Sequence, residues 1–153
     1  AVAAGRGIAL AMGTEGVPPH ARALEVRVGA EGGGEVRVGG VATGDGPPRL
    51  TRIGGFHVDV VPRGTLLVLR NDDVPGVIGH VGTALGEAGV NIAEYHQARL
   101  EPGGEALAVV TLDGAVDPAV REALLALPHV RTATLVRFRD GGGEAAGGRV
   151  WGW

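Results

Sequence analysis

Cysteine is absent from this 153-residue sequence, and aromatic residues make up only 3% of it. Without cysteine the chain can form no disulfide, no thiolate nucleophile and no cysteine-ligated metal site. Hydrophobic residues still account for 44% of the chain, so a core is possible, and it must be built from Val, Leu, Ile and Ala. The length allows one ordinary domain or two small ones.

The sequence also has neither a long basic run nor a long apolar run. Its net charge of −3 argues against a nucleic-acid-binding surface. No apolar stretch approaches the roughly 18 residues of a membrane-spanning helix, and no signal peptide is recognisable. We therefore expect a soluble, cytoplasmic protein with no membrane partner. The chain opens at Ala1 rather than at Met, which is compatible with a fragment of a longer protein.

Catalytic and metal-binding patterns are missing as well. A dinucleotide-binding domain needs a glycine-rich turn between a strand and a helix, followed by an acidic residue about 20 residues later. Residues 29–34 (GAEGGG) lie between two predicted strands instead. The histidines His80, His96 and His129 do not have metal-ligand spacing, and no nucleophile and base can be grouped into an active site. We predict no catalytic residue, no metal site and no dehydrogenase activity of this chain alone.

Residues 1–62 are predicted to form a small, mostly β domain that is incomplete. Apolar and polar residues alternate at 24–28 and at 36–38, and the glycines at 32–34 between them indicate a hairpin loop. Further strands are predicted at residues 8–12, 50–53 and 56–60. Such a sheet must bury one face, and the only helical candidate is the short piece at residues 1–7. We expect upstream sequence or a second copy to cover that face.

Residues 63–139 are predicted to form a ferredoxin-like domain of the α+β class. Strand-like and helical patterns follow the order βαββαβ, with strands expected at residues 65–69, 90–100, 105–112 and 130–138. Asp117 and Pro118 indicate the N-cap and first residue of the second helix, which Pro128 ends. This order packs two helices on one face of an antiparallel four-stranded sheet. The opposite face and the edges would stay open, which favours pairing into a homodimer or higher oligomer.

The most informative stretch joins the first two strands of this domain, over residues 71–91. Pro75 is expected in the first turn of a helix, and apolar residues follow at helical spacing. This stripe consists of Val77, Ile78, Val81, Ala84, Leu85 and Ala88. At the helix entrance, unpaired N–H groups and the positive dipole end face a loop with Asn71, Asp72 and Asp73, which suits a carboxylate beside an ammonium. The alternative is that Asp73 is an ordinary helix cap.

A different face of the same helix carries Gly79, Gly82 and Gly86. Each glycine costs about 1 kcal/mol of helix propensity relative to alanine, so three of them need a compensating gain. Close approach of a partner or a ligand to the helix backbone would supply it. The alternative is a sequence that is rich in glycine and alanine throughout.

These segments together resemble an ACT domain, the amino-acid-sensing module of metabolic enzymes. The chain is similar in particular to the C-terminal regulatory end of bacterial D-3-phosphoglycerate dehydrogenase. The matching segments are residues 69–79 (LRNDDVPGVIG), Gly82, 85–86, 89–93 (GVNIA), Arg99, 103–106 (GGEA) and 127–130 (LPHV). Residues 49–56 (RLTRIGGF) resemble the end of the intervening, allosteric substrate-binding domain that precedes the ACT domain in long forms of that enzyme.

The resemblance implies a regulatory rather than a catalytic role. The full-length enzyme oxidises 3-phosphoglycerate with NAD in serine biosynthesis, and serine bound at paired ACT domains inhibits it. We therefore expect no cofactor in this portion, and we expect the catalytic domains of the same enzyme as partners. The implied division is a partial intervening domain at residues 1–62, an ACT domain at 63–139 and a flexible tail at 140–153.

The resemblance also implies an effector site for L-serine or a related small amino acid. Asn71 and Asp73 would contact the effector from the loop before the helix, and a neighbouring subunit would supply Asn91. Their amide and carboxylate groups can accept from an ammonium or donate to a carboxylate. The adjoining effector-binding residues are Pro75, Gly76, Val77 and Ile92. From the residues alone, Asn91 is equally a turn residue after Gly89.

Three arginines, Arg49, Arg52 and Arg63, are candidates for a phosphate site together with His57, as in the intervening domain of some relatives. The alternative is that they are solvated surface residues.

Two other functions of the chain also stay open. One is the beta subunit of an iron–sulfur L-serine dehydratase, although its usual serine-rich N-terminal segment is missing here. The other is a structural dimerisation module that binds no ligand.

Overall fold

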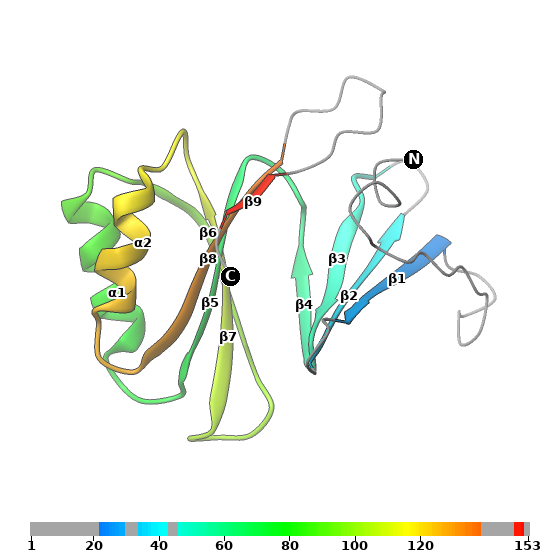
Figure 1. The fold of residues 1–153 in the computed structure, drawn as a ribbon, viewed down its shortest axis with the longest axis horizontal. Helices are drawn as coiled ribbons and strands as arrows, with labels where there is room; N and C mark the ends of the chain where they lie inside the picture. Colours follow the sequence, from blue (N-terminus) through cyan, green and yellow to red (C-terminus); the bar gives the residue numbers. More distant parts are fainter. Residues whose placement is uncertain (1–21, 30–33, 43–45, 139–148, 152–153) are drawn as a thin grey trace.

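The computed structural model describes residues 22–29, 34–42, 46–138 and 149–151. In these ranges the chain forms two antiparallel sheets and two helices. Both helices cover one face of the larger sheet, and the smaller sheet stands on its other side (Figure 1). No helix in these ranges is long and apolar enough to cross a membrane. The strand predicted at residues 8–12, and the helical piece before it, lie outside the described residues.

The smaller sheet has the strand order β1-β2-β3-β4. Its strands are β1 (Arg22–Gly29), β2 (Glu35–Ala42), β3 (Arg49–Ile53) and β4 (Phe56–Val60), which confirms the strands predicted in this region. Phe56, Val58 and Val60 are buried along β4, and the residues between them are exposed. This alternation is the mark of a strand with one face packed on protein and the other in solvent.

The larger sheet has the order β6-β7-β5-β8-β9, and its elements follow the predicted βαββαβ sequence. They are β5 (Thr65–Asp72), α1 (Val77–Glu87), β6 (Ile92–Arg99), β7 (Glu105–Leu112), α2 (Pro118–Leu125) and β8 (Val130–Arg137). The ferredoxin-like α+β prediction is thus confirmed. The sheet also has a fifth strand, β9 (Arg149–Trp151), paired antiparallel with β8. β9 lies within residues 140–153, for which we predicted a flexible tail and no strand, because a strand of three residues is too short to show alternation.

The core under the helices comes from one stripe of α1 packed on alternate residues of the central strands. Val77, Val81 and Leu85 are at most 2% exposed and belong to this core, as predicted. Ile78 was predicted in the same stripe but is 53% exposed. Because successive helix residues are rotated by about 100°, Ile78 points away from the sheet when Val77 points toward it.

The opposite face of the larger sheet is covered by the smaller sheet. Phe56, Val58 and Val60 of β4 form a second core cluster with Leu66 of β5 and Leu107 of β7. Leu66 lies on this face because side chains alternate along β5, so its neighbours in sequence face the helices. The prediction that this face stays open for another copy is therefore wrong where β4 covers it.

The outer half of the smaller sheet is not covered by any described residue. Leu24, Val26 and Val28 of β1 are 45–69% exposed. The register pairs Val26 with Val38 and Val38 with Ile53, so these residues share the face whose inner half packs on the larger sheet. Cover for this outer half, from upstream sequence or a second copy, stays a prediction.

The described residues also leave the glycine face of α1 open. A Cβ atom added to Gly79, Gly82 or Gly86 would meet no described atom within 4 Å. Close approach to this face by a described part of the chain is therefore not the reason for the three glycines. Approach by a partner or a ligand stays a prediction.

Candidate functional site

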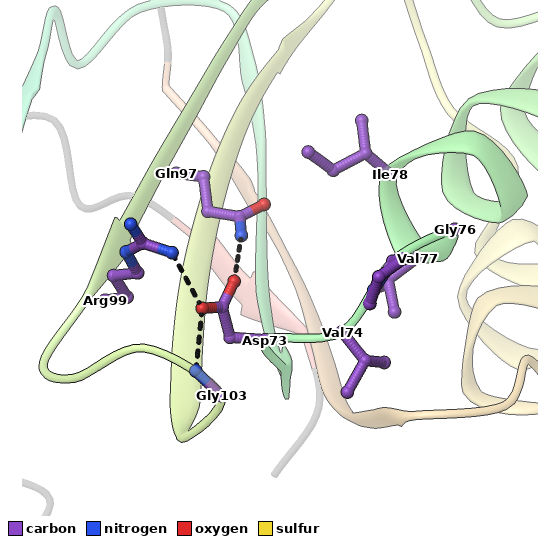
Figure 2. Close-up of a pocket in the computed structure, with 9 residues that line it drawn as sticks. Asp73, Val74, Gly76, Val77, Ile78, Gln97, Arg99 and Gly103 are labelled. Atoms are coloured by element: carbon purple, nitrogen blue, oxygen red, sulfur yellow. Dashed lines mark hydrogen bonds and ion pairs between the residues drawn. The ribbon is translucent and has the colours of Figure 1, made fainter.

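A cavity of about 410 Å³ lies at the entrance of α1. Its walls come from the loop between β5 and α1, the first turn of α1, the end of β6 and the turn between β6 and β7. The lining consists of residues 73–78, Gln97, Arg99 and Gly103. Figure 2 shows the Asp73 carboxylate directed from the loop toward β6, with the hydrophobic residues Val74, Val77 and Ile78 on the helix side. The cavity thus combines one acidic group with an apolar wall.

The Asp73 carboxylate is held by three donors of the β6–β7 hairpin. Arg99 Nη1 donates to Oδ2 at 3.0 Å, and the Gly103 N–H donates to the same oxygen at 3.1 Å. Gln97 Nε2 donates to Oδ1 at 3.4 Å. The hydrogen bond from Gly103, and then that from Arg99, lower the pKa of Asp73 below its ordinary value. The carboxylate is therefore ionised near neutral pH and has a fixed orientation.

The entrance of α1 differs from its predicted form. Gly76 is the N-cap residue with φ 95°, a left-handed conformation that suits glycine, so Pro75 precedes the helix instead of occupying its first turn. No side chain of the described residues caps α1. The interpretation of Asp73 as a cap is wrong, because its carboxylate binds the hairpin. The first-turn N–H groups lack intrahelical partners and, with the helix dipole, favour an anion here.

Gln97 adds an unused acceptor to the cavity. Its Oε1 atom is buried and has no hydrogen-bond partner among the described residues. Leaving a buried acceptor unpaired costs about 1–3 kcal/mol, so a ligand that donates to Oε1 would remove this cost. The Tyr95 hydroxyl, on the same face of β6, is also buried without a partner in the described chain, and burial raises the pKa of Tyr95.

Five residues of the cavity lining were not predicted from the sequence, namely Val74, Ile78, Gln97, Arg99 and Gly103. One signal for two of them was present in the sequence. Residues two apart in a strand share a face, so Tyr95, Gln97 and Arg99 lie together on the side of β6 that faces the helices. Three polar residues on a face that should be apolar indicate a functional surface or a network of hydrogen bonds.

Asn71, a predicted effector contact, is only 1% exposed and does not line the cavity. Its Nδ2 atom donates to the backbone oxygen of Asp72 at 2.8 Å, and its Oδ1 atom has no partner among the described residues. Direct contact between Asn71 and an effector stays a prediction, and this burial disfavours it. A role in supporting the loop fits the geometry better.

The other predicted effector residues fall into two groups. Asp73, Pro75, Gly76 and Val77 come together in the cavity. Asn91 and Ile92 lie instead at the start of β6, at the far end of that strand from Gln97, and the Asn91 Nδ2 atom donates to Asp113 Oδ2 at 2.6 Å. A contribution of Asn91 from a neighbouring subunit stays a prediction.

The predicted phosphate site receives little support. Arg49 pairs with Asp59, and Arg63 Nη2 lies 3.5 Å from Glu94 Oε1, so two of the three guanidinium groups already have carboxylate partners. Phosphate binding by these residues and Arg52 stays a prediction that the two ion pairs disfavour. In the described ranges, no three His, Asp or Glu side chains are grouped so that they could hold a metal ion.

Asp72 fixes the other side of the loop that carries Asp73. Arg131 Nε donates to Asp72 Oδ1 at 2.7 Å, and His129 Nδ1 lies 3.2 Å from Oδ2. The hydrogen bond from Arg131, and then that from His129, lower the pKa of Asp72 below its ordinary value of 3.8. The two neighbouring acids thus tie the loop to β8 on one side and to the β6–β7 hairpin on the other.

Acid should destabilise the fold by protonating Asp72, which then loses its contacts with Arg131 and His129. Because the pKa of Asp72 is lower in the folded than in the unfolded state, its contribution to stability is complete above about pH 3.8 and is lost as the pH falls through the lower, folded value. We expect Asp72→Asn to make stability less dependent on pH in this acid range. Urea unfolding of both proteins at a series of pH values below about 5 measures this, and equal pH dependence would contradict it.

Comparisons with known proteins identify similar sequences. Residues 65–129 match the family model of the ACT domain. The chain is 33% identical over 91 residues to a D-3-phosphoglycerate dehydrogenase from Methanocaldococcus jannaschii, which is 60% of this chain and 17% of that protein. The Bacillus subtilis protein of that name is 34% identical over 88 residues, which are 58% of this chain and 17% of that protein. The Archaeoglobus fulgidus protein is 34% identical over 140 residues, which are 90% of this chain and 26% of that protein. The chain spans about a quarter or less of the length of these relatives.

Proposed function

We propose that this chain is the amino-acid-binding and dimerising portion of a cytoplasmic D-3-phosphoglycerate dehydrogenase of serine biosynthesis. The premise is that residues 65–129 match the ACT domain and that the chain is homologous to the C-terminal regulatory part of that enzyme. The effector is L-serine or a related small amino acid. In this proposal the chain regulates and does not catalyse. NAD and the catalytic groups belong to the other domains of the full-length enzyme.

The observation that carries the proposal is the ionised Asp73 beside the uncapped start of α1. A free amino acid bears an ammonium and a carboxylate on one carbon atom, so it can bridge two such groups. Asp73 accepts hydrogen bonds from the ammonium, and the first-turn N–H groups of α1 donate to the carboxylate. Gln97 Oε1 accepts from the ammonium or from the serine hydroxyl. The Asp73 carboxylate, the first-turn N–H groups and Gln97 Oε1 then each have a hydrogen-bonding partner on the effector.

Dimerisation brings Asn91 to this site. β6 is the edge of its sheet and pairs only with β7 in the described part of the chain. Antiparallel pairing of β6 with β6 of a second copy, about a twofold axis, places the start of one strand beside the end of the other. Asn91 and Ile92 of the second copy then lie beside Gln97 and Arg99 at the cavity. The Asn91 amide can donate to the effector carboxylate.

The relatives reported above favour the dehydrogenase over the serine dehydratase subunit, and no observation on this chain favours the dehydratase. A dimerisation module that binds no ligand differs from our proposal in the role of the cavity at the start of α1. Such a module gives no role to the ionised Asp73 carboxylate or to Gln97 Oε1, which share one cavity and of which Oε1 has no hydrogen-bond partner among the described residues.

Calorimetric titration of the chain with L-serine tests the proposal. We expect saturable binding, one effector per chain, and a rise in melting temperature on adding serine, because a ligand that binds only the folded state stabilises it. D-serine has the same charges in the opposite arrangement and serves as the control, with weaker binding expected. No heat and no thermal shift at millimolar L-serine would instead support the module without a ligand. Molecular mass by light scattering tests the dimer independently.

A further inference from the structure

A second cavity, of about 230 Å³, lies where α2 begins beside the ends of β5 and β8. It is lined by Thr65, Val116, Pro118, Arg121, Leu135 and Arg137. Thr65 starts β5 and Asp73 follows the end of this strand, so the two cavities are at opposite ends of β5. The Thr65 hydroxyl already donates to the Gly114 oxygen at 3.1 Å. The polar side-chain groups of the lining that remain as donors for a ligand are therefore the guanidinium groups of Arg121 and Arg137.

Arg121 and Arg137 differ from most arginines of the described chain in having no carboxylate partner there. The arginines with such a partner are Arg27, Arg37, Arg49, Arg63, Arg70, Arg99 and Arg131. Arg121 Nε donates to the Ala133 oxygen at 2.9 Å, which fixes its guanidinium group against β8 and leaves two terminal nitrogens for another acceptor. Two cations thus share one cavity, and none of the described residues that line it is acidic.

We propose that this cavity binds a small aliphatic carboxylate. A guanidinium group presents paired N–H donors that match the two oxygens of a carboxylate, and two such groups exceed what one solvated surface arginine provides. Val116, Pro118 and Leu135 form an apolar wall that accommodates a short hydrocarbon chain. An inorganic phosphate would satisfy the arginines but would leave this wall without a partner. The helix end is not the site, because Asp117 accepts from the Ala119 N–H and caps α2.

Chemical-shift titration of the isotope-labelled chain with sodium butyrate tests the proposal. We expect saturable shifts of the backbone signals at the start of α2 and at the end of β8. Arg137→Gln breaks no hydrogen bond or ion pair of the described residues, so the fold should persist, and butyrate binding should weaken about tenfold. Arg22→Gln removes the same charge from an exposed arginine of β1 that also has no carboxylate partner in the described chain, and binding should not change.

Three outcomes would overturn the site or its ligand. Equal weakening by Arg137→Gln and Arg22→Gln would mean that butyrate responds to overall charge. Chemical-shift changes confined to the Asp73 cavity on adding butyrate would mean that butyrate binds there and not between Arg121 and Arg137. Saturable binding of inorganic phosphate at Arg121 and Arg137 without any binding of butyrate would exclude the aliphatic carboxylate. L-serine titration of Arg137→Gln keeps this test separate from the proposed effector site, since serine binding should not change.

Discussion

Replacing Phe56 by alanine is expected to lower the free energy of unfolding by about 3–5 kcal/mol. Phe56 is 2% exposed and belongs to the cluster through which β4 packs on the larger sheet. Removing the ring takes away its burial and leaves a cavity that the neighbouring side chains fill only in part. The Arg70 guanidinium carbon also lies 5.8 Å from the centre of the ring, so a cation–π contact is lost as well.

Urea unfolding followed by circular dichroism measures this loss. Leu24→Ala is the matched control, because Leu24 lies on the same face of the smaller sheet but is 69% exposed. Its removal should change stability by no more than about 0.5 kcal/mol. A loss at Phe56 as small as that at Leu24 would mean that the two sheets do not pack on each other in solution.

The elements that the sequence predicted are those whose signals are local. Alternation of buried and exposed residues marks β4, and the Asp117-Pro118 pair marks the start of α2, where Asp117 accepts from the Ala119 N–H at 2.8 Å. These patterns depend on a few adjacent residues and on the geometry of one element. Their prediction therefore needed no knowledge of what the element packs against.

Packing between the two sheets was missed although a signal for it exists. Residues 106–112 of β7 are all buried, with no polar–apolar alternation along the strand. A strand that is apolar on both sides indicates cover on both faces, whereas the prediction left one face open. The sequence does not say which element provides the second cover, because that depends on the path of the chain between residues 60 and 65.

Only the part of the candidate site that is local in sequence was predicted. The loop and the helix entrance were found because Asp73 and Pro75 to Val77 are adjacent in sequence. Arg99 and Gly103, which hold Asp73, are 26 and 30 residues away, and no local pattern joins them to it. The start of α1 at Val77 could not be predicted either, because a proline is as common in a turn as in the first turn of a helix.

The second large effect concerns binding, where Asp73→Ala is expected to weaken L-serine affinity about a hundredfold. A hydrogen bond to a charged group contributes about 1.5–3 kcal/mol, and about 2.7 kcal/mol corresponds to this change in affinity. The substitution also leaves Arg99 without the carboxylate that it contacts at 3.0 Å. An unpaired guanidinium near the position of the serine ammonium would repel it and add to the loss.

Asp73→Asn separates charge from shape, because its amide oxygen can still accept from the ammonium but carries no negative charge. We expect a loss of about tenfold, between wild type and alanine. Glu87→Gln, at the other end of α1, makes the same change in net charge and should not alter binding. Calorimetry with L-serine measures all four proteins after circular dichroism has established that each is folded. If Asp73→Ala bound L-serine as tightly as wild type, the ammonium could not be paired with Asp73, and the effector would have to bind outside this cavity.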